Sequence, residues 1–127
     1  MRENAQVSKG FITEFGFDLY IGNNFIAGHN LKMIDCNVVT IGNNITVGEE
    51  VEIYTSNHAF DAVKRVQHWC SESPATIGNN VVIGNNVTIL PGVTIGNNSW
   101  IKTGSVVIED IPADVIANGI PCKIERN

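Results

Sequence analysis

The stretch TIGNNVVIGNNVTILPGVTIGNNSWI, residues 76–101, places an isoleucine at every sixth position. The five positions are Ile77, Ile83, Ile89, Ile95 and Ile101. An α-helix repeats at about 3.6 residues and a strand at about two, so neither element alone has this period. A period of six instead indicates a repeated unit made of one short strand and one turn.

The same unit recurs along most of the chain in two blocks. It usually reads aliphatic, Gly, Asn, Asn, then a small or β-branched residue at the fifth position. The twelve first positions are Ile21, Ala27, Met33, Ile41, Val47, Ile53, Ile77, Ile83, Ile89, Ile95, Ile101 and Val107. Residues 59–76 break the pattern between the two blocks, and we interpret them as a protruding loop.

A strand followed by a sharp turn, repeated in this way, winds into a coil with three flat faces. We expect Gly and Asn to form the turns because both tolerate positive φ. The first-position aliphatics should point inward and stack, while the Asn columns form structural ladders. The sequence therefore predicts an all-β parallel β-helix, one domain over residues 1–127, with about four coils and a partial coil before Ile21. Pro112 and Pro121 stop the coil, so residues 111–127 should fold back as a C-terminal cap.

The composition narrows the class of function. The chain has 127 residues, 43% hydrophobic and 17% charged, with a net charge of −5. Eight Lys and Arg form no basic stripe, which argues against nucleic acid as a partner. No apolar run approaches the ~20 residues of a membrane span. The start lacks the apolar core of a signal peptide, and Cys36, Cys70 and Cys122 match no zinc spacing. We therefore expect a cytoplasmic protein with free thiols.

Four stretches resemble one known family. They are EFGFDLYIGNNF (14–25), VEIYTSNHAFD (51–61), IGNNVVIGNNVTILPGVTIGNN (77–98) and GSVVIEDIPADVIANGIPCKI (104–124). They resemble the hexapeptide-repeat acyltransferases, and most of all the maltose and galactoside O-acetyltransferases. The resemblance implies a left-handed coil, a homotrimer with active sites between neighbouring prisms, and no metal. It also implies acetyl transfer from acetyl-CoA to a hydroxyl of a saccharide or similar small molecule.

Two catalytic positions follow from this resemblance. His58, in TSNHAFD, matches the family's catalytic histidine. With a pKa near 6.5, an imidazole can remove the proton of an attacking hydroxyl and then protonate the departing thiolate. Asn85 matches the position whose backbone N–H stabilises the oxyanion of the thioester carbonyl. Losing a donor of this kind typically costs about 3 kcal/mol of transition-state stabilisation.

Binding positions follow in the same way. Asp35 and Glu14 match acceptor contacts of the family and are expected to hold sugar hydroxyls. Thr103 and Gly104 match the strip along which the pantetheine of acetyl-CoA lies. Lys123 matches a basic residue near the nucleotide phosphates, where a lysine serves as a point charge.

The chain also departs from the family pattern. Gly28 and His29 occupy the stretch where relatives often carry an acceptor-binding Asn. Val82 stands where Trp is usual, and Cys70 lies where a loop carboxylate commonly orients the catalytic histidine. These departures leave the proposed base intact. They leave open which acceptor is used, and whether the protein is an inactive acyltransferase-like relative.

Other functions are compatible with the same repeat. A γ-class carbonic anhydrase would hold zinc with three histidines, and the chain has His29, His58 and His68. The last two are ten residues apart, whereas that family places two ligands five apart. An ice-binding or scaffolding solenoid is disfavoured because Thr is scattered along the sequence and the loop interrupts the prism. N-acetylation of an amino-sugar or other small amine stays open, because an amine acceptor would need the same base.

Overall fold

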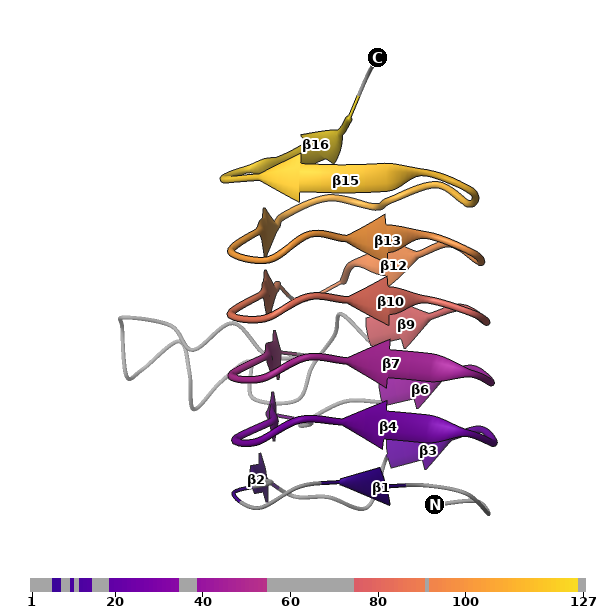
Figure 1. Cartoon of the computed structure of the whole chain (residues 1–127), viewed down its shortest axis with the longest axis vertical. Helices are drawn as coiled ribbons and strands as arrows, with labels where there is room; N and C mark the ends of the chain where they lie inside the picture. Colours follow the sequence, from indigo (N-terminus) through magenta and orange to yellow (C-terminus); the bar gives the residue numbers. More distant parts are fainter. Residues whose placement is uncertain are drawn as a thin grey trace, which may run out of the picture.

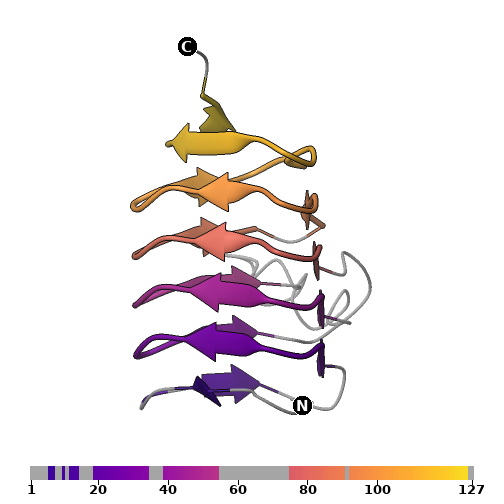
Figure 2. The same ribbon diagram turned by 45° about the vertical axis from the view of Figure 1, so that its right-hand side comes forward.

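The computed structural model describes residues 6–7, 10, 12–14, 19–34, 39–54, 75–90 and 92–125. Every element in these ranges is a short strand or a turn. The strands stack in flat rungs along one long axis, with the N-terminal strands at one end and the C-terminal strands at the other (Figure 1). The view turned by 45° shows the same regular stack (Figure 2). The predicted β-helix is thus confirmed over the described residues.

The described strands form three sheets, one for each face of a prism. The seven-stranded sheet contains, in order, β1 (Gln6–Val7), β4 (Phe25–Ala27), β7 (Ile45–Val47), β10 (Val82–Ile83), β13 (Trp100–Ile101), β15 (Ile116–Gly119) and β16 (Cys122–Ile124). The five-stranded sheet contains β2 (Ile12–Glu14), β5 (Lys32–Ile34), β8 (Glu52–Tyr54), β11 (Thr88–Ile89) and β14 (Val106–Val107). The four-stranded sheet contains β3 (Leu19–Ile21), β6 (Val39–Ile41), β9 (Ala75–Ile77) and β12 (Thr94–Ile95).

Consecutive strands lie in different sheets, and three of them make one coil. The strand that follows three places later pairs in parallel with the first, as β4 does with β7. β1, β2 and β3 therefore form a complete coil ending at Ile21, where the sequence predicted only a partial one. The fifth coil closes through a parallel bridge between Ile95 and Ile111, and β15 begins a sixth. The prism is longer than the repeat count indicated, because the strands before Ile21 lack the Gly-Asn-Asn signature.

The core lies along the prism axis and is built from two positions of each unit. All twelve first-position residues are buried, as predicted. The fifth position is also buried, which the repeat pattern alone did not predict; examples are Phe25, Ile45 and Val87. Where the fifth position is Ser99 or Ser105, the hydroxyl donates to a backbone carbonyl, at 2.7 Å to Pro112 and 2.8 Å to Lys102. These bonds satisfy the buried hydroxyls.

The turns differ from the sequence prediction in one respect. Positive φ belongs to the fourth position of the unit, as at Asn44 (62°) and Asn80 (59°), and not to the glycine at the second position. That glycine is needed because neighbouring coils come close together. A Cβ placed on Gly42 would lie 2.8 Å from the backbone of Gly78. The assignment of positive φ to this Gly was therefore wrong, whereas the assignment to Asn is confirmed.

The predicted loop is shorter at its C-terminal end than expected. β8 ends at Tyr54 and β9 begins at Ala75, so residues 75 and 76 belong to a strand and not to a loop over 59–76. In this strand Ala75 pairs with Val39 of β6. The inserted residues therefore fall at the corner between the five-stranded and four-stranded sheets. His58 lies among residues 55–74, outside the described residues.

The C-terminal segment forms a hairpin at the end of the seven-stranded sheet. β15 pairs in parallel with β13, and β16 turns back antiparallel to β15 with Gly119 opposite Cys122. The Cys122 side chain is buried, and it is a free thiol whose pKa is raised by burial. The coil therefore does not stop at Pro112 as predicted, because Ile111 and β15 continue it. The predicted fold-back corresponds to β16 alone.

The outward-facing columns differ from sheet to sheet. On the seven-stranded sheet the column is largely apolar and consists of Ile26, Thr46, Val82, Trp100 and Ile116. On the four-stranded sheet it consists of Tyr20, Thr40, Thr76 and Thr94. Thr40, Thr76 and Thr94 thus stack in one column on this sheet, whereas Thr46 and Thr88 lie on the other two sheets. The expectation of scattered threonines therefore holds only in part. Among the described residues, no helix is long and apolar enough to cross a membrane.

Candidate active site

The prism has three edges, which we name by the sheets they join. Corner 1 leads from the four-stranded to the seven-stranded sheet and comprises residues 22–24, 42–44, 78–80 and 96–98. Corner 2 leads from the seven-stranded to the five-stranded sheet and comprises residues 28–30, 48–50, 84–86 and 102–104. Corner 3 leads from the five-stranded to the four-stranded sheet and includes the insertion between Tyr54 and Ala75.

Corner 1 is an uninterrupted asparagine ladder. The backbone N–H of each third-position Asn donates to the side-chain oxygen of the Asn one coil further along. Asn23 donates to Asn43 at 2.8 Å, Asn43 to Asn79 at 2.8 Å, and Asn79 to Asn97 at 2.7 Å. The fourth-position side chains form a second ladder, including Asn24 to Asn44 at 2.8 Å. This confirms the structural ladders expected from the sequence.

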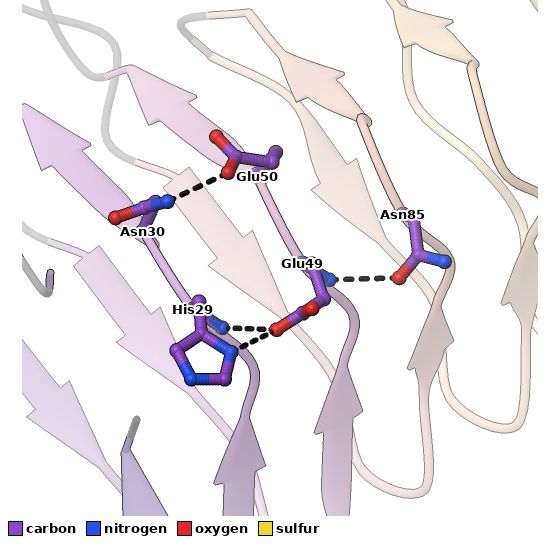
Figure 3. A network of polar contacts seen from close by, with 5 residues as sticks. All are labelled: His29, Asn30, Glu49, Glu50 and Asn85. Carbon is purple, nitrogen blue, oxygen red and sulfur yellow. Dashed lines mark hydrogen bonds and ion pairs between the residues drawn. The ribbon is translucent and has the colours of Figure 1, made fainter. Parts of the chain in front are cut away.

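Corner 2 keeps the backbone geometry but changes the side chains. Its third positions are His29, Glu49, Asn85 and Thr103, and the side-chain oxygens of the last three each accept the backbone N–H of the third position one coil before. Figure 3 shows this ladder from His29 to Asn85. The N–H of His29 donates to Glu49 Oε2 at 2.6 Å, and that of Glu49 to Asn85 Oδ1 at 2.8 Å. The same ladder therefore runs through residues that can also do chemistry.

Three of the predicted site residues meet directly at corner 2. The backbone N–H of Asn85, the proposed oxyanion donor, donates to Thr103 Oγ1 at 3.1 Å. The N–H of Gly104 donates to the carbonyl of Asn85 at 2.8 Å. Gly104 has a φ of +80°, and a Cβ there would meet no atom within 4 Å, so open space lies beside it. A thioester oxygen bound to the Asn85 N–H would have to replace the Thr103 hydroxyl.

Lower on the same corner, His29 and Glu49 form a pair that the sequence did not predict. Glu49 Oε2 lies 2.5 Å from His29 Nδ1 and also accepts the His29 backbone N–H. These bonds from His29, the backbone one first, lower the pKa of the Glu49 carboxyl. Both side chains remain about half exposed, at 57% and 52%. The sequence signal that could have revealed this pair is the absence of Asn at the third position of the repeat at both His29 and Glu49.

The other predicted residues lie apart from this cluster or outside the description. Lys123 is exposed on β16, opposite Asn118. The backbone of Glu14 ends β2 and pairs with Ile34, and its side chain is not described. Asp35 and His58 lie outside the described residues.

At corner 3, the last described residue before the insertion is an ionisable one. The hydroxyl of Tyr54 donates to Glu52 Oε1 at 2.7 Å. Burial, together with this bond to a carboxylate, raises the pKa of Tyr54 to about 12. Tyr54 therefore stays protonated at neutral pH and can act there only as a neutral donor or acceptor.

The apolar column of the seven-stranded sheet runs beside corner 2. Four of its side chains are large and substantially exposed: Ile26 at 48%, Val82 at 43%, Trp100 at 46% and Ile116 at 40%. The Lys102 ammonium lies 5.7 Å from the centre of the Trp100 ring. A polar edge next to an apolar strip can hold a ligand that has both kinds of surface. Within the described ranges, no group of three His, Cys, Asp or Glu could hold a metal ion.

The prism, its six-residue repeat and the residues of corner 2 can now be compared with those of known protein families. Residues 74–109 match the family model "bacterial transferase hexapeptide (six repeats)". The chain aligns over 97% of its length, at 36% identity and a TM-score of 0.86, with 70% of a hexapeptide-repeat-containing acetyltransferase of Vibrio cholerae. A structure of that acetyltransferase from the O1 biovar eltor complexed with acetyl-CoA aligns at a TM-score of 0.81 and 35% identity, over 98% of this chain and 72% of that one. The chain belongs to the hexapeptide-repeat acetyltransferases, and its fold is their left-handed β-helix.

Within this family it is similar to the sugar-modifying group. It is 43% identical over 124 residues, 98% of its length, to the galactoside O-acetyltransferase of Escherichia coli. A galactoside acetyltransferase structure in complex with coenzyme A aligns at a TM-score of 0.81 and 36% identity, over 95% of this chain and 64% of that one. The chain spans about three fifths of the length of the curated relatives it matches, for example 61% of the E. coli enzyme.

Proposed function

We propose that the chain transfers an acetyl group from acetyl-CoA to a hydroxyl of a sugar or similar small molecule. The observation that carries this proposal is the meeting of Asn85, Thr103 and Gly104 at corner 2, beside open space and an apolar strip. Support also comes from the relatives, since one is named a galactoside O-acetyltransferase and others have been solved with coenzyme A or acetyl-CoA.

The proposed reaction is a direct attack without an acyl-enzyme. His58 removes the proton of the acceptor hydroxyl as its oxygen bonds to the thioester carbonyl carbon. The carbonyl oxygen becomes negative and is held by the backbone N–H of Asn85. The C–S bond then breaks, the thiolate of CoA leaves, and the imidazolium of His58 protonates it. Holding both substrates together supplies much of the rate by removing the entropy cost of their encounter.

The binding roles complete the proposal. Thr103 and Gly104 flank the pantetheine, where the absence of a side chain at Gly104 leaves room for it. Lys123 lies near the phosphates of the nucleotide, and Asp35 and Glu14 contact the acceptor. No metal has a part in this reaction. A cytoplasmic location stays a prediction from the sequence.

We further propose that the active form is a homotrimer in which each site is shared by two chains. Corner 2 carries the Asn85 donor, whereas the insertion that contains His58 joins the prism at corner 3, a different edge. A second copy can bring its corner 3 next to corner 2 of the first. The exposed apolar column of Ile26, Val82 and Trp100 lies on a face that such packing can cover.

The base is tested by thiol release from acetyl-CoA with methyl galactoside or maltose as acceptor. We expect His58→Ala to lower kcat by a factor of about 10² to 10⁴, the usual contribution of a general base. His68→Ala is the matched control and should retain activity. Equal rates for His58→Ala and the wild type would contradict the assignment, and a parallel loss in both variants would favour the metal-site alternative.

The shared site is tested by subunit complementation. Gly104→Trp fills the open space beside corner 2 and should abolish activity while leaving His58 in place. Co-expression of Gly104→Trp with His58→Ala should restore activity, because each mixed trimer contains one site with an intact corner and an intact base. A mixture that stays as inactive as either variant alone would show that each site belongs to a single chain.

A further inference from the structure

Ser105 is a buried hydroxyl at a position that holds an aliphatic residue in the preceding coils. It is the fifth residue of the repeat at corner 2, and the same position is Leu31, Val51 and Val87 in the three coils before it. All four side chains are fully buried. A hydroxyl in an apolar column destabilises the core unless it finds hydrogen-bond partners. The partners of Ser105 therefore indicate why a serine stands here, and the reaction proposed above gives it no part.

The Ser105 hydroxyl bonds to two different segments of the chain. It donates to the carbonyl of Lys102 at 2.8 Å, which closes the turn that contains Thr103 and Gly104. It also accepts the backbone N–H of Gly119, in the C-terminal hairpin, at 3.1 Å. A serine hydroxyl has one donor and two acceptor sites, so both bonds can form at once. One buried oxygen thus joins the turn to the hairpin.

The thiol of Cys122 adds a third contact from the hairpin. Burial raises the pKa of Cys122, and a hydrogen bond with Ser105 lowers it. Cys122 lies opposite Gly119 where β15 turns into β16, so both contacts come from the same end of the hairpin. A further link between the two segments is the ion pair of Lys102 with Glu125 at 2.9 Å, in which each side chain is 37% exposed. Exposed pairs of this kind contribute little, so the buried Ser105 bonds are the stronger link.

We propose that Ser105 is a positioning residue for acetyl-CoA. The turn that it closes carries Thr103 and Gly104, expected along the pantetheine, and the hairpin that it holds carries Lys123, expected near the nucleotide phosphates. Fixing the turn to the hairpin keeps these two parts at one relative position, which reduces the ordering that a long flexible ligand would otherwise impose on binding. The inference rests on the proposed function and adds to the same site a residue that is itself buried and acts through its neighbours.

Ser99 provides a matched comparison in the same coil. It holds the same fifth position at corner 1, after Phe25, Ile45 and Val81 in the preceding coils, and it too is buried. Its hydroxyl donates to the carbonyl of Pro112 at 2.7 Å. Loss of either serine hydroxyl leaves a buried polar group unpaired, which lowers stability. Only the loss at corner 2 also releases the turn at the proposed acetyl-CoA site.

The experiment measures the affinity for coenzyme A by calorimetric titration of the whole chain. We expect Ser105→Ala to raise the Kd about tenfold, the change expected if the turn is in its binding conformation about a tenth of the time. Ser99→Ala should leave the Kd unchanged, although both variants should melt at a lower temperature than the wild type. With methyl galactoside as acceptor, Ser105→Ala should raise the KM for acetyl-CoA by a similar factor and keep kcat within about twofold, since the groups that act in the chemical step are intact.

Two further variants separate the hydroxyl from the volume of the side chain. Val and Thr have nearly the same shape and differ in the hydroxyl, and Val87 already occupies this position one coil before. Ser105→Thr should bind coenzyme A as tightly as the wild type, whereas Ser105→Val should bind it as weakly as Ser105→Ala. Equal affinities of the Thr and Val variants would mean that the hydroxyl is not what positions the turn.

The link to the hairpin can be tested without any substrate. Cys122 is alkylated with N-ethylmaleimide, and its peptide is followed by mass spectrometry to distinguish it from Cys36 and Cys70. We expect faster alkylation in Ser105→Ala than in Ser99→Ala, because the hairpin opens more often without the buried bonds. Loss of the Ser105 bond also removes its lowering effect on the pKa of Cys122, which by itself would slow alkylation. Faster alkylation therefore reports opening, and equal rates would show that Ser105 does not hold the hairpin.

The outcomes separate this inference from the proposed function. A wild type that binds coenzyme A no more tightly than Ser105→Ala does would leave the proposed function standing and overturn the positioning role alone. An equal loss of affinity in Ser99→Ala would also overturn it, because general destabilisation would then explain the effect. A wild type that binds no coenzyme A would overturn the proposed function and the binding role of Ser105 together, while the alkylation rates would still show whether Ser105 holds the hairpin.

Discussion

Corner 1 and corner 2 have the same backbone geometry but carry different side chains. Both have the Gly-x-x turn, positive φ at the fourth position, and a backbone N–H of one coil bonded to a side-chain oxygen of the next. Corner 1 uses Asn at third positions from Asn23 to Asn97, whereas corner 2 uses His29, Glu49, Asn85 and Thr103. The contrast teaches that the repeat specifies where a side chain sits, while the departures from the repeat indicate which edge is used.

The largest effect concerns the part that the two corners share. A methyl group added to Gly42 at corner 1 or to Gly48 at corner 2 would lie about equally close to the next coil, with the nearest backbone atoms at 2.8 Å. We expect Gly42→Ala and Gly48→Ala to lower the free energy of unfolding by similar amounts, about 1–3 kcal/mol each. Urea unfolding at one fixed protein concentration measures this, since assembly also contributes.

Gly104→Ala is the matched control for this prediction. Its Cβ would meet nothing within 4 Å, so only the positive φ of +80° opposes it. The expected loss is about 1 kcal/mol, the usual cost of a side chain in the left-handed region. If Gly48→Ala cost no more than Gly104→Ala, close approach of the coils would not explain the second-position glycines.

An intermediate effect should appear when the corners exchange fourth-position residues. Glu50 at corner 2 and Asn44 at corner 1 lie in the same coil with φ of 58° and 62°. Glu50→Asn should raise the free energy of unfolding by about 0.5–1 kcal/mol, because Asn tolerates this φ better. Asn44→Glu should lower it by about 1–2 kcal/mol, since a carboxylate cannot replace the amide that donates to Asn80. Thermal melts of both variants give the sign. Destabilisation by Glu50→Asn would mean that Glu50 does not lower the stability of corner 2 relative to Asn.

The sequence predicted the prism because its signal is periodic and local. An aliphatic residue at every sixth position and an Asn that tolerates positive φ act within a few residues of each other. The sequence missed the first coil, since β1 and β2 owe their place to pairing with β4 and β5 and not to their own composition. It also missed the short column of Thr40, Thr76 and Thr94, because the stacking of Thr40 on Thr76 joins residues on either side of the insertion.

The residues of the candidate site could be predicted from the sequence only in part. Asn85, Thr103 and Gly104 could be assigned by resemblance, and the structure brings them into contact. The His29–Glu49 pair could not, because the two residues are 20 positions apart and become neighbours only when the coils stack. Once the number of residues in a coil is known, the sequence predicts which residues lie next to each other in successive coils. A departure from Asn at one position should therefore be read together with the residue one coil away.

The smallest effect tests the charge of corner 2 through pH. The pKa of Glu49 is lowered by the backbone N–H and then the ring of His29, so the ionised form is the one that the fold favours. A carboxyl of depressed pKa adds stability above its unfolded pKa, and that stability is lost as the pH falls through the folded value. Wild type should therefore melt slightly above Glu49→Gln at about pH 6–7, and this difference should shrink as the pH falls below the ordinary range of a glutamate carboxyl.

The Asn43→Ala variant is the control, because it removes the equivalent bond at corner 1 without a titrating group. Its melting difference from wild type should stay constant over the same pH range. A Glu49→Gln difference that also stayed constant would mean that the Glu49 carboxylate acts at corner 2 as the Asn43 amide does at corner 1, through hydrogen-bond geometry alone.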